Sequence, residues 1–148
     1  YYRNHVYPLM GPGWGATADY ILLSDGDTID VALFTDWSFW SDGGAFTRFD
    51  ADEYTVKAGE TLTFRTLKYE TKSVADGGSE SFQPVEGMTV KLYNEQWTEL
   101  AEITPAESGD AFQYVIDKPG DYYLLALDPN AGTEAARLAP ATARLRVS

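Results

Sequence analysis

Apolar and polar residues alternate in several short runs along the second two-thirds of the chain. Every second residue is apolar in 61–65 and in 89–92, and the same spacing recurs in 112–116. This period of two places the apolar side chains on one face of a strand. Turn-forming residues separate the runs, as in Lys118-Pro119-Gly120-Asp121. From Glu53 onward the pattern predicts about seven strands, as expected for an antiparallel β-sandwich.

Helical signals are confined to a single stretch. Residues 134–138 read Glu-Ala-Ala-Arg-Leu, which are good helix formers. The stretch is too short to be a stable helix alone, and Pro140 ends it. We therefore expect a helical turn or a loop here, and an all-β protein.

The run 122–127 carries apolar side chains on both of its faces. Gly120 precedes Tyr122 at the start of this run, where a tyrosine hydroxyl can bond back to the backbone upstream. We expect Tyr122 and Leu124 to be buried between two sheets. The other face, with Tyr123, needs a further cover that two sheets alone do not provide.

The first 52 residues follow a different pattern. Two apolar runs, 19–23 and 28–34, flank Ser24-Asp25-Gly26-Asp27, which predicts a β-hairpin. Residues 35–44 form an aromatic loop with no clean period. This segment is too short to bury a core of its own. We expect residues 1–52 to pack on a sandwich formed by residues 53–148, as one cooperative unit.

Charge excludes several classes of partner. The 148 residues include 11 Lys and Arg against 23 Asp and Glu, a net charge of −12. Nucleic acid requires clustered basic residues, and so does an anionic membrane surface. No apolar run approaches the roughly 20 residues of a spanning helix. We expect no nucleic-acid partner and no membrane insertion by this fragment, which begins at Tyr1 and which we take for part of a longer protein.

Few residues favour catalysis. His5 is the only histidine and cysteine is absent, which leaves little for nucleophilic or His/Cys metal chemistry. Paired carboxylates could act in a glycosidase, but most carboxylates of so acidic a chain are solvated. The candidates are Asp30, Asp36, Asp42, Asp50, Asp52 and Glu53. We expect no enzyme and no cofactor.

Calcium is the metal that the acidic residues fit best, because it takes oxygen ligands in flexible geometry. Asp25, Asp27 and Asp30 lie close together in the sequence. A hairpin turn requires the same residue types, so these three are weak candidates and we predict no metal site.

The aromatic loop is the most suggestive functional feature. Trp37, Phe39 and Trp40 could stack on sugar rings or anchor a protein interface, with Trp14 as a further contributor. Alternatively, these rings bury between the N-terminal segment and the sandwich. The sequence leaves both possibilities open.

The chain resembles bacterial immunoglobulin-like domains of multidomain surface proteins over residues 54–148. The resemblance rests on Val56-Lys57-Ala58-Gly59-Glu60-Thr61-Leu62-Thr63-Phe64, Pro84-Val85-Glu86-Gly87-Met88-Thr89-Val90 and Lys118-Pro119-Gly120-Asp121-Tyr122-Tyr123. It implies an immunoglobulin-like antiparallel β-sandwich and says little about function.

A second stretch, Gly13-Trp14-Gly15 followed by residues 19–31, resembles the end of a small β-rich domain of unknown function. That family is similar to the C-terminal domain of the cobalamin carriers intrinsic factor and transcobalamin. No residue here matches one that binds cobalamin in those carriers.

These observations favour a non-catalytic module of a bacterial secreted or cell-surface protein, located outside the cell. Its role would be spacing, display or adhesion, and its partners would be other domains of the same protein and a glycan or host protein. The alternative is a carbohydrate-binding module that uses exposed tryptophans.

Overall fold

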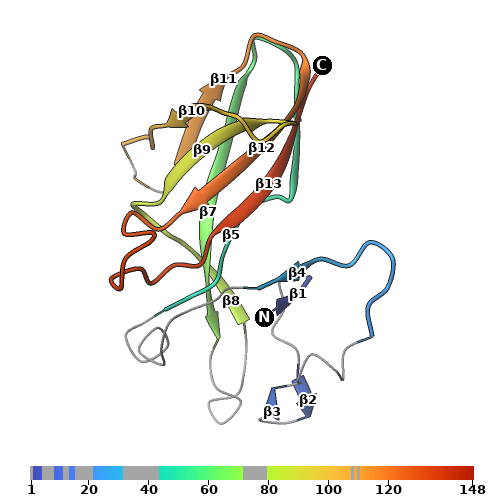
Figure 1. Cartoon of the computed structure of the whole chain (residues 1–148), viewed down its shortest axis with the longest axis vertical. Coiled ribbons are helices and arrows are strands. Elements are labelled where there is room, and N and C mark those ends of the chain that lie inside the picture. Colours follow the sequence, from blue (N-terminus) through green and yellow to red (C-terminus); the bar gives the residue numbers. More distant parts are fainter. Residues whose placement is uncertain are drawn as a thin grey trace.

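The computed structural model describes residues 2–4, 9–11, 14–15, 22–31, 44–71, 80–107, 109 and 111–148. These residues form strands, turns and loops, with no helix among them, so the all-β prediction is confirmed (Figure 1). The strands are β1 (Tyr2–Arg3), β2 (Leu9–Gly11), β3 (Trp14–Gly15), β4 (Ile29–Asp30), β5 (Thr47–Phe49), β6 (Glu53–Val56), β7 (Thr61–Thr71), β8 (Glu80–Pro84), β9 (Thr89–Asn94), β10 (Glu99–Ile103), β11 (Ala111–Val115), β12 (Gly120–Leu127) and β13 (Ala141–Val147).

The larger sheet has five strands in the order β10-β9-β12-β13-β6. All neighbouring strands are antiparallel except β13 and β6, which run parallel. Strand β12 lies at the centre, so that Tyr123 is opposite Tyr93 of β9 on one side and Arg144 of β13 on the other. This register brings three side chains of different strands into one row across the sheet.

The second sheet is organised around β7. The first half of β7 pairs with β11, and its second half pairs with β5 and with β8. The predicted boundary at Glu53 falls between β5 and β6, which belong to different sheets of the sandwich.

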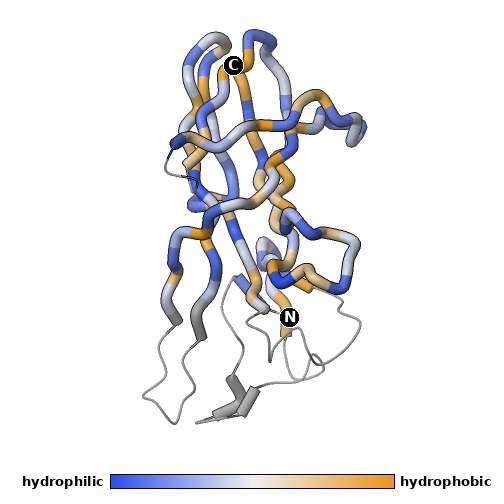
Figure 2. The backbone as a smooth tube through the Cα atoms, turned by 90° about the vertical axis from the view of Figure 1, so that its left-hand side faces the viewer, coloured by the Kyte–Doolittle hydropathy of each residue, from blue (hydrophilic) through white to orange (hydrophobic). Residues whose placement is uncertain are grey.

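The core lies between the two sheets and follows the alternation read from the sequence. Along β12, Tyr122 and Leu124 are buried, and the alternate residues of β13 are buried as well. Aromatic rings of the second sheet fill the centre, where Phe64 stacks on Phe112 with ring centroids 5.2 Å apart. Figure 2 displays the same alternation of apolar and polar residues along the strands.

The hydrogen bond expected of Tyr122 is confirmed. Its hydroxyl donates to the backbone carbonyl of Lys118 at 2.9 Å, across the turn that precedes β12. Gly120 in that turn has φ +154°, and a Cβ there would lie 3.5 Å from the Tyr122 ring. The turn and the ring therefore pack closely against one another.

Residues 128–140 form a loop between β12 and β13, with turns and no helix. Asp128, which is 6% exposed, holds this loop together. Its carboxylate accepts hydrogen bonds from the backbone N–H groups of Asn130, Arg137 and Leu138, at 2.7–2.8 Å. The loop in turn receives the chain ahead of β5, because Ala45 forms a parallel bridge with Leu138.

Most of residues 44–49 are buried against the sandwich, with Gly44 and Arg48 half-buried. Phe49 packs edge-on against Phe64 of β7, with ring centroids 5.7 Å apart. Phe46 joins Tyr69 and Ala139 in a second, smaller apolar cluster. Residues 45–49 therefore belong to the packed body of the sandwich.

Candidate functional site

The structure gives no side-chain position for the aromatic residues singled out in the sequence. Trp37, Phe39 and Trp40 lie outside the described residues. The backbone of Trp14 lies in β3, opposite Gly11 of β2. The side chain of Trp14 is not among those that the structure describes.

The weak metal candidates are found at a turn near the N-terminus. Asp25 lies in the turn itself, and Asp30 in β4 is opposite Tyr2 of β1. Most of the expected hairpin of 19–23 with 28–34 lies outside the described residues; within them, β4 pairs with β1 and residues 22–24 form no strand. Among the described residues, no group of three or more His, Cys, Asp or Glu side chains is placed to hold a metal ion.

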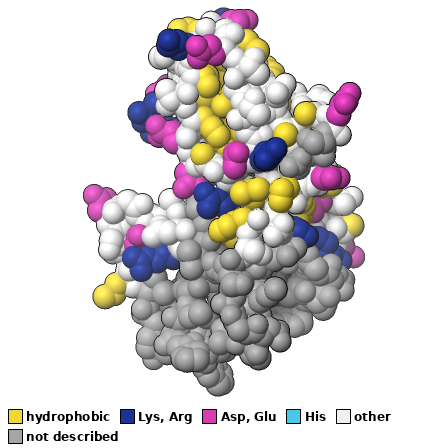
Figure 3. Space-filling view, turned by 180° about the vertical axis from the view of Figure 1, so that it is seen from behind, with side chains coloured by type: hydrophobic (Ala, Val, Ile, Leu, Met, Phe, Trp, Pro, Cys, Tyr) yellow, Lys and Arg dark blue, Asp and Glu magenta, His cyan; other side chains and the backbone are white. Residues whose placement is uncertain are grey.

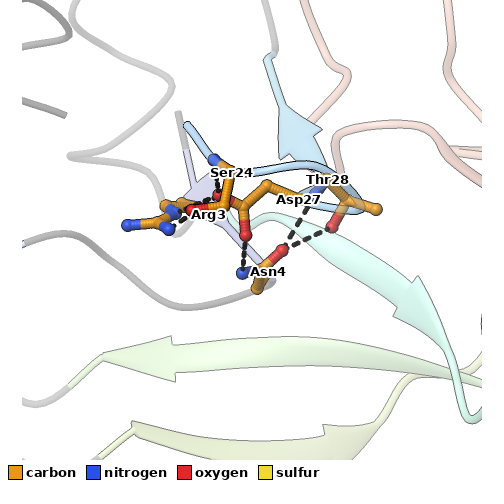
Figure 4. A network of polar contacts seen from close by, with 5 residues as sticks. All are labelled: Arg3, Asn4, Ser24, Asp27 and Thr28. Carbon is orange, nitrogen blue, oxygen red and sulfur yellow. Dashed lines mark hydrogen bonds and ion pairs between the residues drawn. The ribbon is translucent and has the colours of Figure 1, made fainter. Parts of the chain in front are cut away.

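Asp27 is the centre of a polar network that joins residues 3–4 to residues 24–28 (Figure 4). Its Oδ2 atom accepts from the Ser24 N–H at 2.7 Å and from Arg3 Nε at 2.9 Å, and its Oδ1 atom accepts from Asn4 Nδ2 at 2.7 Å. The Ser24 N–H, then Asn4 and Arg3, lower the pKa of Asp27 to about 2. The carboxylate thus serves to tie two chain segments together.

A different aromatic group lies on the outer face of the five-stranded sheet. Trp97 stacks on Tyr123, with ring centroids 4.8 Å apart and planes within 8° of parallel. Tyr93 lies beside Trp97, with centroids 5.6 Å apart and a tilt of 48°. We call these three rings the aromatic platform. Trp97 is 52% exposed, so the platform presents its indole to solvent.

The hairpin between β9 and β10 positions Trp97. Asn94 closes the turn, because its Oδ1 accepts from the N–H groups of Gln96 and Thr98, and its carbonyl accepts from the Trp97 N–H at 3.0 Å. Trp97 has φ +57°, in the left-handed region that bulky residues rarely adopt. This conformation costs about 1–2 kcal/mol, which the turn and the stack on Tyr123 offset.

Charged side chains border the platform on both sides. On β9 and β10, Lys91 Nζ donates to Glu99 Oε2 at 2.9 Å, and the Tyr93 hydroxyl lies 3.4 Å from the same oxygen. The hydrogen bond to Glu99 raises the pKa of Lys91.

On β12 and β13, Asp121 lies 3.4 Å from Arg146 Nε and 3.8 Å from Arg144 Nη2. Each border therefore contains both hydrogen-bond donors and acceptors close to the rings.

The platform accounts for part of an expectation about β12. The outer face of this strand needed a cover beyond the two sheets, and Trp97 supplies it for Tyr123. Leu125 and Leu127 on the same face are half-buried. The apolar residues on both faces of 122–127 predicted that something covers the outer face, but they did not indicate which residue does so. Trp97 lies 26 positions away in the sequence, in a short hairpin.

Charged side chains of both signs are mixed on part of the described surface. On the face drawn in Figure 3, Lys and Arg side chains are interspersed with Asp and Glu rather than gathered into one basic patch. None of the described residues belongs to a helix with the length and apolar character needed to cross a bilayer.

No protein-family model matches the chain, and no curated protein matches it in sequence.

Proposed function

We propose that this chain is a non-catalytic module of a bacterial secreted or cell-surface protein, and that it works by adhesion through the aromatic platform. Other domains of the same protein are its covalent neighbours, and a glycan or a host protein is its external partner. The proposal starts from the resemblance of residues 54–148 to immunoglobulin-like domains of surface proteins.

The strand order supports the immunoglobulin-like assignment. In that fold, strand F lies between C and G in one sheet, and B and E are neighbours in the other. Here β12 lies between β9 and β13 in one sheet, and β7 lies beside β11 in the other. The two arrangements correspond if β9, β12 and β13 are strands C, F and G, and β7 and β11 are strands B and E. The tyrosine hydrogen bond at the start of β12 agrees with the position of a tyrosine corner in strand F.

One observation carries the choice of adhesion over spacing or display. Trp97 is half-exposed on the outer face of a sheet, although burial would be the favourable state for an indole ring. Its backbone adopts a costly conformation that keeps the ring on Tyr123. Exposed, rigidly held aromatic rings are the residues that most often dominate binding surfaces.

A carbohydrate-binding module is the second candidate, and the platform favours it specifically. A flat indole supported from below by a second ring is suited to the C–H face of a sugar. In this form the proposal rests on Trp97, Tyr93 and Tyr123 rather than on Trp37, Phe39, Trp40 and Trp14.

An adhesion assay tests the proposed function. Beads coated with the chain are washed over surfaces carrying mucin, an extracellular-matrix protein or a neutral polysaccharide, and retained beads are counted. We expect retention on at least one surface, and loss of retention with Trp97→Gly, because glycine accepts the positive φ while removing the ring.

The matched control is Phe82→Ala, which removes a partly exposed ring from the other sheet. Equal retention of wild-type and Trp97→Gly beads would contradict adhesion through the platform. No retention on any surface would favour a spacer.

A further inference from the structure

We propose that the aromatic platform binds a neutral hexopyranose unit of a glycan, with Trp97 as the stacking ring and the Lys91–Glu99 pair as the polar contact. This inference rests on the proposed function and adds the chemical class of ligand and the residues that recognise it. It concerns described residues of β9, β10 and β12 and the hairpin between β9 and β10.

The arrangement of the rings leaves one face for a ligand. Tyr123 covers one side of the Trp97 indole in a nearly parallel stack, and Trp97 remains 52% exposed. A pyranose has a face lined by C–H groups, which carry partial positive charge and match the negative face of an aromatic ring. One indole provides the area for one sugar ring, and the tilted Tyr93 borders it on one side.

The polar contact is next to the rings. Glu99 accepts from Lys91 Nζ at 2.9 Å, and the Tyr93 hydroxyl is 3.4 Å from the same carboxylate oxygen. The pair thus places a carboxylate acceptor and an ammonium donor side by side. Neighbouring sugar hydroxyls both donate and accept hydrogen bonds, so they are able to satisfy both partners at once.

Charge favours a neutral sugar over an acidic one. The whole chain carries a net charge of −12, which repels sulfated and carboxylated glycans at long range. The Lys and Arg side chains that border the platform are already paired with Glu99 and Asp121. Their positive charges are therefore largely balanced by neighbouring carboxylates, which leaves little net positive charge to attract an acidic sugar.

A quaternary ammonium ligand is the competing chemistry, because aromatic rings and an acidic protein both attract cations. Such ligands are held in cages of several ring faces. Here Tyr123 already occupies the inner face of Trp97, which leaves a flat surface and not a cage. The geometry thus favours the sugar.

Binding to one ring and one polar pair is expected to be weak. We expect a dissociation constant on the order of 1 mM for a single site. Several copies of the module on one surface would raise the overall affinity by avidity.

Titrations of the whole chain followed by two-dimensional amide and indole NMR test the inference. The probes are cellotetraose and lactose as neutral glycans, a heparin tetrasaccharide as an acidic one, and choline chloride as a cation. We expect at least one neutral glycan to shift the Trp97 indole signal, with weaker effects of the heparin fragment and of choline.

Two variants and two controls locate the site. We expect Trp97→Gly to weaken neutral-glycan binding about tenfold or more, which is about 1.4 kcal/mol or more. Glu99→Gln keeps the shape but removes the charge, and we expect it to weaken binding severalfold. The two controls alter an exposed ring and an exposed carboxylate elsewhere, with Phe82→Ala and Glu60→Gln, and we expect both to bind as wild type. A dispersed amide spectrum establishes that each variant is folded.

The outcomes separate this inference from the proposed function. Wild-type affinity in Trp97→Gly, or tighter binding of heparin or choline than of the neutral glycans, would overturn the sugar assignment. Loss of bead adhesion in Trp97→Gly together with no glycan shift would overturn the sugar assignment and leave adhesion standing, and retention on the extracellular-matrix protein would then identify a protein ligand. No glycan shift and no adhesion would contradict both.

Discussion

The hydroxyl of Tyr122 offers a sharp test of how the sandwich is held together. The change Tyr122→Phe removes the donor of the 2.9 Å hydrogen bond to the Lys118 carbonyl and leaves the ring in place. The ring is 8% exposed and packs in the main core, so the substitution creates no cavity. The measured effect therefore reports the hydrogen bond itself.

The exposure of the acceptor sets the magnitude. Lys118 lies in an exposed turn and its bond with Tyr122 is only partly buried, so we expect water to reach the carbonyl when the hydroxyl is lost. The cost is then the net value of one hydrogen bond, about 1 kcal/mol, rather than the larger cost of a buried unpaired carbonyl. For a chain of this size, that corresponds to a fall in Tm of about 3 °C.

Urea unfolding followed by circular dichroism measures the difference. We expect a lower midpoint with an unchanged m-value for Tyr122→Phe, because the surface exposed on unfolding is the same. Tyr93→Phe is the matched control, since its hydroxyl makes only a 3.4 Å contact at the surface, and it should change stability by less than about 0.5 kcal/mol. Equal stability of Tyr122→Phe and wild type, or an equal loss in the control, would refute the reasoning.

Four further outcomes concern Asp128, Asp27 and the extent of the cooperative unit. Asp128→Ala is expected to lower the free energy of unfolding by about 3 kcal/mol in urea melts, because three loop N–H groups lose a buried charged acceptor, and Asp128→Asn should lose less. Burial raises the pKa of Asp128, but the backbone hydrogen bonds to its carboxylate lower the pKa by more and leave it below its usual value. The contribution of Asp128 to stability should therefore be lost as acid protonates it. The carboxyl carbon of Asp27 should titrate with a midpoint near pH 2, so the network with Arg3 and Asn4 persists at pH 5 and is lost only as the pH falls through about 2; a midpoint near 4 by NMR would contradict it. In calorimetry, residues 44–148 should unfold cooperatively, whereas residues 53–148 should not, because they lack β5 and its buried Phe49; equal transitions would contradict this.

Local patterns in the sequence were sufficient to predict most strands of the sandwich, namely β6, β7 and β9 to β13, but not β5 or β8. Leu62 and Phe64 of β7, and Val90 and Leu92 of β9, are buried as their spacing indicated. The position of Tyr122 after a turn glycine was enough to predict its hydrogen bond. These features depend on neighbours in the sequence, through the period of two and through turn chemistry.

Features that depend on distant pairing could not be predicted. Strand β5 is only three residues long, and it is a strand because β7 continues beyond its pairing with β11. The loop 128–140 is fixed by contacts of Asp128 and Ala45 rather than by its own helix propensity.

The aromatic platform belongs to this second group. It exists because β9 and β12 pair in a register that places Tyr93 opposite Tyr123, and because a turn with a positive φ at Trp97 folds the indole over them. Neither the register nor the left-handed residue has a signal in a single sequence, since tryptophan is not a residue that turns of this kind favour.

The most direct test of the account is fluorine NMR of the chain labelled with 5-fluorotryptophan, during titration with the neutral glycans. The four tryptophans give separate signals, and the one lost in Trp97→Gly identifies Trp97. We predict that the Trp97 signal moves in a saturable way while the other three stay in place. A titration in which Trp14, Trp37 or Trp40 moves and Trp97 does not would contradict the assignment of the binding surface to the outer face of the five-stranded sheet.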